Sequence, residues 1–255
     1  MQIYKFRDLT IINELDKETV IACDSCCGIG ERELDIIKSD NKIVGYFSAR
    51  VCLFELLAFK ARPQVIVNNL GMPMKGQGER IIEGINRAIE EYNNTDFFND
   101  KYDLKECVTG STEDNFNTLQ TFLGLTIVGK KSKEKKKNFE KGDAVVLLGI
   151  PKVGIEVLEE LKSEKREIVG FKELKLLSEF EGVKEILPIG SKGAIHEVKE
   201  LEVSNNIKIE IKYDSEKLRK SAGPATALLF MCSNESIEEI KNKIYIPMIK
   251  IGEVI

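Results

Sequence analysis

Apolar residues recur along the chain in two spacings, one typical of strands and one typical of helices. Residues 43–60 are apolar on most sides, as in a helix buried within a domain, whereas residues 79–92 place their isoleucines on one face. The other predicted helices are residues 154–162, 171–180, 194–201 and 236–243. The predicted strands are residues 7–12, 19–24, 64–68, 121–129, 144–149, 207–211, 228–232 and 245–251. Strands and helices in both halves of the chain predict an α/β fold.

The character of the chain changes near Gly142, where a polar stretch gives way to an apolar strand. Residues 130–137 are mostly lysine, and such a run predicts a solvated loop. A chain of 255 residues is long enough to bury two modest cores. We therefore predict an N-terminal domain over residues 1–140 and a C-terminal domain over residues 141–255.

Composition and charge exclude several classes of protein. The 38 basic and 42 acidic residues give a formal charge of −4, so general attraction to nucleic acid is not expected. Apolar residues make up 42% and charged residues 31%, a balance typical of an ordered globular protein. No apolar run approaches the length of a membrane helix, and the first residues lack the apolar region of a signal peptide. The sequence predicts a soluble cytoplasmic protein without a membrane partner.

Six cysteines and one histidine, His196, limit the available chemistry. Cys23, Cys26 and Cys27 lie together, but no second cysteine or histidine pair stands at zinc-site spacing. We predict free thiols packed as small apolar groups, and a metal–thiol or redox protein is a distant alternative. Carboxylates, lysines and backbone amides remain for any chemistry.

Several carboxylates stand at the ends of apolar segments or inside them. Asp24 ends a strand before the loop of Gly28 and Gly30, and Glu55 interrupts an apolar helix. Glu113 and Asp114 follow a turn of glycine, serine and threonine. Carboxylate oxygens in loops are the ligands that Mg²⁺ prefers. Each carboxylate alone is more often a cap, a turn residue or one half of an ion pair.

The segment from Val44 to Pro63 resembles the aminoimidazole ribonucleotide (AIR) synthase superfamily. It has that family's glycine-led helix, ending in a small residue two positions before a proline, with Glu55 where the family usually has Asp. Residues 7–12 and 22–24 resemble its first two acidic strands, and residues 108–113 its Gly-Gly-Asp/Glu-Thr turn. Residues 142–146 are similar to its domain-linking strand, so the resemblance covers nearly the whole chain.

The resemblance implies two α/β domains, with the N-terminal sheets of two chains forming a barrel across a homodimer. It also implies ATP-dependent activation of a small-molecule substrate, with ATP and Mg²⁺ as cofactors. The implied metal ligands are Asp8, Asp24, Glu55 and Glu113. The implied nucleotide contacts are Gly28, Gly30, Gly110 and Thr112.

Two positions depart from the family pattern. Ser111 stands at a usually acidic position, and Lys192 stands in a turn where the family has Asp. Lys192 is either a phosphate contact at the start of a helix or an exposed turn lysine. Asp24 or Asp114 could accept the proton of an attacking ribose hydroxyl.

Four segments give a narrower resemblance, to the α-ribazole kinases of cobamide (cobalamin) salvage. They are residues 8–12, 22–30, 110–115 and 220–226. This resemblance implies a kinase that phosphorylates the riboside α-ribazole. Two alternatives remain open: a superfamily kinase for another nucleoside or vitamin precursor, and a non-catalytic nucleotide-binding subunit.

Overall fold

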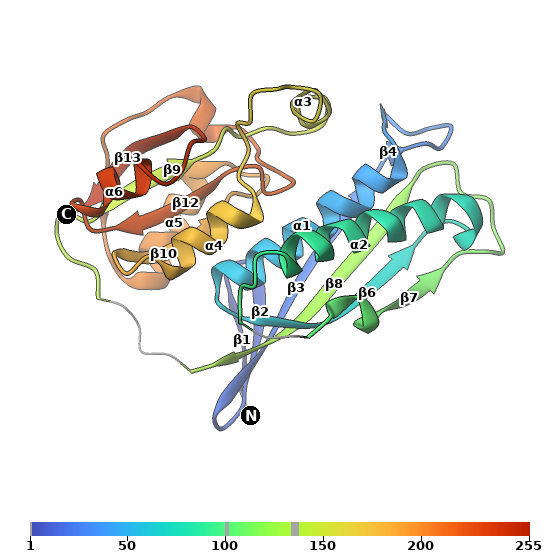
Figure 1. Cartoon of the computed structure of the whole chain (residues 1–255), viewed down its shortest axis with the longest axis horizontal. Coiled ribbons are helices and arrows are strands. Elements are labelled where there is room, and N and C mark those ends of the chain that lie inside the picture. Colours follow the sequence, from blue (N-terminus) through green and yellow to red (C-terminus); the bar gives the residue numbers. More distant parts are fainter. Residues whose placement is uncertain (1, 100–101, 134–137) are drawn as a thin grey trace. The chain divides into compact units, whose positions relative to one another are not determined.

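The computed structural model describes residues 2–99, 102–133 and 138–255 (Figure 1). The chain divides into two compact units, Met1–Lys133 and Glu134–Ile255. Each unit contains a β-sheet and helices, so the α/β class predicted from the sequence is correct. Among the described residues, no helix has the length and apolar character needed to cross a membrane.

The first unit is built on a six-stranded sheet in the order β1-β2-β3-β8-β6-β7. Its strands are β1 (Gln2–Phe6), β2 (Leu9–Asn13), β3 (Lys17–Cys27), β6 (Arg62–Leu70), β7 (Val108–Thr112) and β8 (Phe122–Ser132). Neighbouring strands are antiparallel, except that β6 and β7 run parallel. In the described part of the chain the sheet is open, with β1 and β7 as its edges. A separate parallel pair joins β4 (Ile29–Gly30) to β5 (Ile37–Lys38).

Helices α1 (Asn41–Ala58) and α2 (Glu79–Asn93) lie side by side along one face of this sheet (Figure 1). Alternate residues of β3, including Val20 and Ala22, are buried, whereas Cys23 between Ala22 and Asp24 is exposed. The short helices η1 (Met74–Gly78) and η2 (Leu104–Cys107) flank α2 in the connection from β6 to β7. The helices therefore cover one face of the sheet, and alternation directs a second set of side chains to the opposite face.

The second unit contains a five-stranded sheet in the order β10-β12-β9-β13-β11, with every pair antiparallel. Its strands are β9 (Ala144–Leu148), β10 (Val183–Pro188), β11 (Ile209–Ile211), β12 (Leu228–Cys232) and β13 (Met248–Val254). Its helices are α3 (Ile155–Glu160), α4 (Phe171–Glu179), α5 (Ala194–Asn205), η3 (Glu216–Arg219) and α6 (Ser236–Lys241).

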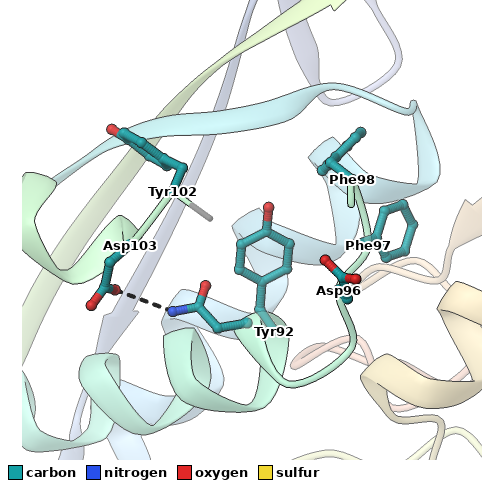
Figure 2. A pocket seen from close by; sticks show the side chains of 7 residues that line it. Tyr92, Asp96, Phe97, Phe98, Tyr102 and Asp103 are labelled. Carbon is teal, nitrogen blue, oxygen red and sulfur yellow. Dashed lines mark hydrogen bonds between the residues drawn. The ribbon is translucent and has the colours of Figure 1, made fainter. Parts of the chain in front are cut away.

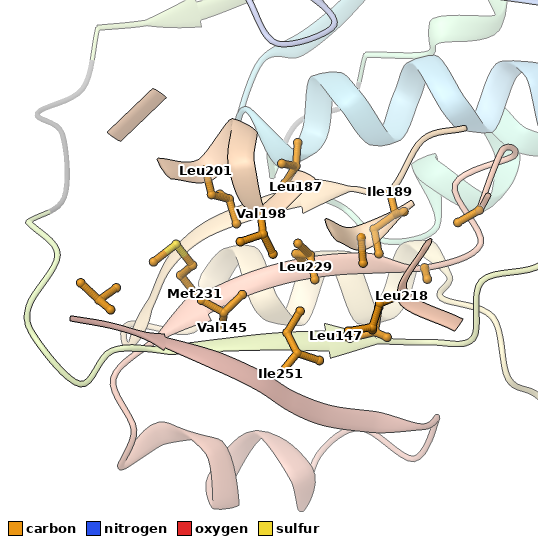
Figure 3. Packing of buried hydrophobic residues seen from close by; sticks show 14 residues of the cluster. Val145, Leu147, Leu187, Ile189, Val198, Leu201, Leu218, Leu229, Met231 and Ile251 are labelled. Atoms are coloured by element: carbon orange, nitrogen blue, oxygen red, sulfur yellow. The ribbon is translucent and has the colours of Figure 1, made fainter. Parts of the chain in front are cut away.

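Alternate residues of the central strands, such as Val145 and Leu229, pack with Val198 and Leu201 of α5 (Figure 3). The residues between them in β9 and β12 are buried as well. Both faces of this sheet are therefore covered, which explains why its central strands are continuous apolar runs.

The structure differs from the sequence prediction in several elements. The segment predicted as a turn at residues 108–113 is mostly strand β7, which pairs with β6 although its glycine, serine and threonine have little preference for strands. Strands β1 and β10 were not predicted. The predicted basic loop begins within β8, because Lys130 pairs with Thr19 in the ladder and its ammonium donates to Glu14. Residues 134–137 of that loop lie outside the described residues.

The two helices of the first unit approach each other at glycine. A Cβ added at Gly84 of α2 would lie 2.6 Å from the backbone nitrogen of Tyr46 in α1. Gly45 of α1 likewise faces the backbone of Ile81 in α2. The backbones of α1 and α2 are therefore in direct contact at these positions.

We expect Gly84→Ala to lower the free energy of unfolding by about 1–3 kcal/mol, because the added methyl overlaps the backbone of α1. Gly124→Ala is the matched control: its Cβ would meet nothing closer than 3.8 Å, so we expect a change within about 0.5 kcal/mol. Urea denaturation measures both. Equal midpoints for the two variants would contradict the close approach of the helices.

Candidate functional site

Strand register brings residues from four separate segments into one row across the first sheet. Asp24 of β3 lies opposite Leu125 of β8, which lies opposite Asn68 of β6, which lies opposite Gly110 of β7. Neighbouring strands are about 4.8 Å apart, so the row from Asp24 to Gly110 spans about 14 Å. Thr112 lies two residues further along β7, toward the end of the sheet.

The loops at this end of the sheet carry the other predicted residues. We use the name sheet-end cluster for Asp24, Gly28, Gly30, Gly110, Thr112, Glu113 and Asp114. The amide of Gly28 donates to Thr121 O at 3.0 Å, and the amide of Glu113 donates to Leu70 O at 2.9 Å. The structure therefore brings residues that are 90 positions apart in the sequence to one end of the sheet.

Asp24 is the most perturbed carboxylate of the cluster. Asp24 is half-buried, whereas its two neighbours along β3, Cys23 and Ser25, are exposed. Burial raises the pKa of Asp24 from 3.8 to about 6, opposed in part by a hydrogen bond from the Ser25 backbone. Burial also raises the pKa of Cys52 in α1, and the charges of Asp24 and Glu55 add to that effect. Asp24 and Glu55 therefore both act on the same thiol, at the contact of β3 with α1.

Glu113 and Asp114 stabilise the turn after β7. Asp114 accepts hydrogen bonds from Thr112 Oγ1 at 2.7 Å and from the Met74 amide at 3.2 Å. Glu113 Oε1 accepts the amides of Asn115 and Phe116 at 2.8 and 3.1 Å. These bonds fix the turn, and the carboxylates are exposed or half-buried.

Gly110 is required by its neighbour across the parallel pair. A Cβ at this position would lie 2.5 Å from Asn68 Oδ1. Asn68 is buried, and its Nδ2 donates to Thr109 O at 2.9 Å. Sequence reasoning missed Asn68, although two consecutive asparagines at the end of an apolar strand were the available signal.

Gly28 and Gly30 have positive φ angles of 74° and 151°. A Cβ at Gly30 would overlap the hydroxyl of Thr121 and lie 2.7 Å from Asn41 Oδ1. The space beside Gly30 is therefore filled by side chains of this chain. The nearest atom to a Cβ at Gly28 would be Gln120 Nε2, at 3.4 Å.

Three other predicted residues lie outside the cluster. Asp8 is exposed in the turn between β1 and β2. Because Thr10 of β2 pairs with Ile21 of β3, this turn lies beside the C-terminal half of β3, which also contains Asp24. Glu55 is half-buried on α1. Lys192 belongs to the second unit, where it is exposed in the turn before α5.

The four predicted metal ligands do not form a complete metal site by themselves. Among the residues that the structure describes, no three histidine, cysteine, aspartate or glutamate side chains lie close enough together to hold an ion. Mg²⁺ commonly keeps several waters and takes only one or two carboxylates when phosphate oxygens supply the rest. The donor set fits a nucleotide-borne Mg²⁺ better than a resident ion.

The cysteines are free thiols, as predicted. Cys52 and Cys232 are buried and pack as small apolar groups, but Cys23 and Cys27 are exposed. The prediction of packed thiols is wrong for these two, because alternation along β3 directs them to the face opposite α1.

Two cavities of the first unit lie outside the cluster. One, of about 240 Å³, lies at the C-terminal end of α2, where Asn93 Nδ2 donates to Asp103 Oδ1 at 3.1 Å (Figure 2). The other, of about 750 Å³, is lined by the β2–β3 turn, Gln2 and Lys133. Neither is lined by a predicted site residue.

No known family model and no curated protein sequence matches this chain. Solved structures do match it. Thiamine monophosphate kinase from Aquifex aeolicus is 16% identical and gives a TM-score of 0.60, over 97% of this chain and 88% of that chain. PurL from T. maritima, in complex with ATP, is also 16% identical and gives 0.59, over 96% of this chain and 42% of that chain. The E. coli hydrogenase maturation protein HypE is 13% identical and gives 0.57, over 92% and 79%.

The chain shares the fold of these thiamine monophosphate kinase, PurL and HypE structures. The likeness extends through both units, since it covers nearly the whole chain. The mixed α/β fold implied by the resemblance of residues 44–63 and the linked segments is thus confirmed.

Asp24 gives the fold a defined pH dependence. Because its pKa is higher in the folded protein, the folded state binds a proton that the unfolded chain lacks between about pH 4 and 6. We expect the free energy of unfolding to rise as the pH falls from 7.5 to 5.5. Carboxylates with lowered pKa values, such as Glu167 and Glu253, lose their contribution only below about pH 4.5.

Asp24→Asn removes the titrating group, so we expect a flatter pH profile and a fold more stable by about 1–2 kcal/mol at pH 7.5. Urea denaturation in metal-free buffer across this pH range is the measurement. Superimposable profiles for the wild type and the variant would show that Asp24 is not desolvated.

Proposed function

We propose that the chain is an ATP-dependent phosphotransferase whose first unit binds ATP at the sheet-end cluster. The observation that carries the proposal is the row from Asp24 to Gly110, which crosses four strands near one end of the sheet and holds Asp24, Asn68 and Gly110 on three of them. The fold adds support, because a solved ThiL neighbour is in complex with AMPPCP and TMP, and PurL is in complex with ATP. Phosphoryl transfer depends mainly on positioning and charge neutralisation, which such a cluster can supply.

The residues of the cluster take separate roles in this proposal. Asp24 holds magnesium, and Gly28, Gly110 and Thr112 contact the nucleotide. Gly30 shapes the loop instead of contacting the nucleotide, because Thr121 and Asn41 fill the space beside it. Mg²⁺, when bound with ATP, neutralises charge on the phosphates. Asp8, Glu55 and Glu113 are the other proposed ligands, for one or more Mg²⁺ ions, and each ion would take one or two of the four carboxylates.

Asp114 is the proposed acceptor of the proton from the substrate hydroxyl. Its hydrogen bonds from Thr112 and Met74 hold the carboxylate in one orientation. Lys192, exposed in the turn before α5, is proposed to contact a phosphate.

We propose α-ribazole as the acceptor, which would place the enzyme in cobamide lower-ligand salvage. The support is the resemblance of residues 8–12, 22–30, 110–115 and 220–226 to α-ribazole kinases. The last of these segments is firmly held, because Thr226 exchanges hydrogen bonds with the backbone of Lys152. Lys152 in turn pairs with Glu160 and Glu167 at 2.5 and 2.9 Å. Another small nucleoside or vitamin precursor is the alternative acceptor.

A second candidate is a nucleotide-binding subunit without catalysis. Ser111 favours it, because this exposed residue of β7 stands where the family usually has a carboxylate. Both candidate functions include ATP binding, but only the phosphotransferase would turn ATP over.

We further propose that the chain forms a homodimer through the face of the first sheet opposite α1, closing a barrel. On this face, Cys23 and Ser25 of β3 are exposed, and Thr126 and Val128 of β8 are half-buried. A mixed polar and apolar sheet face of this kind suits a pairing between two copies of one surface.

Purified protein with Mg-ATP and α-ribazole tests the activity, with ADP and the phosphorylated riboside followed by mass. We expect a product heavier by one phosphoryl group, and we expect Asp24→Asn to lower kcat at least about 100-fold through loss of charge at the phosphates. The control is Asp16→Asn, an exposed carboxylate in the β2–β3 turn. Full turnover by Asp24→Asn would rule out its assigned role, and ATP binding without product would favour the non-catalytic subunit.

Sedimentation equilibrium tests the dimer. Thr126→Arg places a charge on the proposed interface, so we expect the dimer dissociation constant to rise at least about tenfold. Asn94→Arg, at the exposed end of α2, is the control. A monomeric wild type, or a Thr126→Arg variant that dimerises normally, would refute the interface.

A further inference from the structure

Two loops meet along their length at the sheet end. The first, residues 28–38, follows β3, and the second, residues 113–121, connects β7 to β8. Backbone bonds join them at Gly28 N to Thr121 O and at Leu34 N to Leu119 O, both 3.0 Å. Gln120 Nε2 adds a third bond, to Leu34 O at 3.0 Å. The first loop carries Gly28 and Gly30, and the second carries Glu113 and Asp114.

Asp35 is the buried centre of this contact, with 5% of its surface exposed. Its oxygens accept the Arg32 amide at 2.8 Å, the Thr121 amide at 2.8 Å and the Thr121 hydroxyl at 2.7 Å. All three partners are donors, so a carboxylate satisfies them, whereas an amide side chain would turn one donor toward another. The residue at position 35 therefore has to be an acceptor on both oxygens.

Arg32 adds the second link. Only 8% of its surface is exposed, and its Nη1 donates to Asn117 Oδ1 at 3.0 Å and to Thr118 O. These acceptors are neutral oxygens of the second loop, and Arg32 Nε is buried without a hydrogen-bond partner. A guanidinium buried in this way is costly as a stabilising device. The two bonds that the guanidinium donates instead join residue 32 to the second loop.

Gly30 allows the two loops to close on each other. A side chain at this position would collide with the Thr121 hydroxyl, which donates a hydrogen bond to Asp35. On its other side, the second loop forms two hydrogen bonds with the segment after β6. Asp114 accepts a bond from the Met74 amide, and Thr118 Oγ1 donates a bond to Gly71 O. The second loop is thus fixed between two other parts of the chain.

We propose that Arg32 and Asp35 are positioning residues that hold residues 28–38 and 113–121 as one body at the sheet-end cluster. Neither residue was singled out by the sequence. This coupling of the two loops does not depend on ATP, whereas its effect on ATP binding rests on the proposed function. If the loops carry the nucleotide contacts, loosening them weakens ATP binding more than it slows transfer.

Hydrogen–deuterium exchange of the nucleotide-free chain tests the coupling without depending on activity. We expect Arg32→Lys and Asn117→Ala to raise exchange in residues 113–121 about tenfold, because Arg32→Lys removes the guanidinium and Asn117→Ala removes one of its two bonds to that loop. Asp35→Asn should raise exchange in both loops. Arg87→Ala is the matched control, since Arg87 forms an exposed ion pair with Glu91 on α2.

Unchanged exchange in residues 113–121 of Arg32→Lys and Asn117→Ala overturns the proposal, as does an equal rise throughout the first unit. For a wild type that turns over ATP, we expect the same two variants to raise KM for ATP about tenfold, with kcat changed less than threefold. A fall in kcat at constant KM contradicts positioning of the nucleotide. A wild type that fails to turn over, with loop exchange as expected, refutes the proposed function and leaves the coupling in place.

Discussion

The antiparallel pairing of β3 with β8 is the constraint on which the first unit depends. Each strand contributes 11 residues, from Lys17 opposite Ser132 to Cys27 opposite Phe122. A shift of one residue would move every side chain of β3 to the other face. Asp24 would then leave the α1 side of the sheet, and Cys23 would replace it. The position of the candidate site is thus set by apolar packing at Val20 and Ala22.

The main elements of the fold could be predicted from the sequence because their periodicity is strong. The helices at residues 43–60 and 79–92 coincide with α1 and α2 to within two residues at each end. Strand β7 could not be predicted, because Gly110 and Ser111 have low strand preference and pair only through contact with β6. Residues that depend on tertiary contact for their structure are invisible to local patterns.

The candidate site could be predicted only in part, because the sequence shows residue types but not which residues meet in the fold. Carboxylates and glycines stood out in the chain, and register brought Asp24 and Gly110 into one row. Asn68, Arg32 and Asp35 were missed because their partners lie about 40 to 90 residues away in sequence. With 16% identity to a solved kinase structure, fold survives where many side chains have changed. Function then has to be argued from the site.

The parallel edge pair of β6 and β7 has a consequence for how the protein reaches its native state. The connection between these strands includes η1, α2 and η2, so β7 can pair only after α2 has closed a long loop. Chain closure of this kind is slow compared with hairpin formation such as that of β1 with β2. The edge that carries Gly110, Glu113 and Asp114 is therefore completed late in folding. We therefore expect a newly made chain to form its helices and hairpins before β7 completes this edge of the sheet.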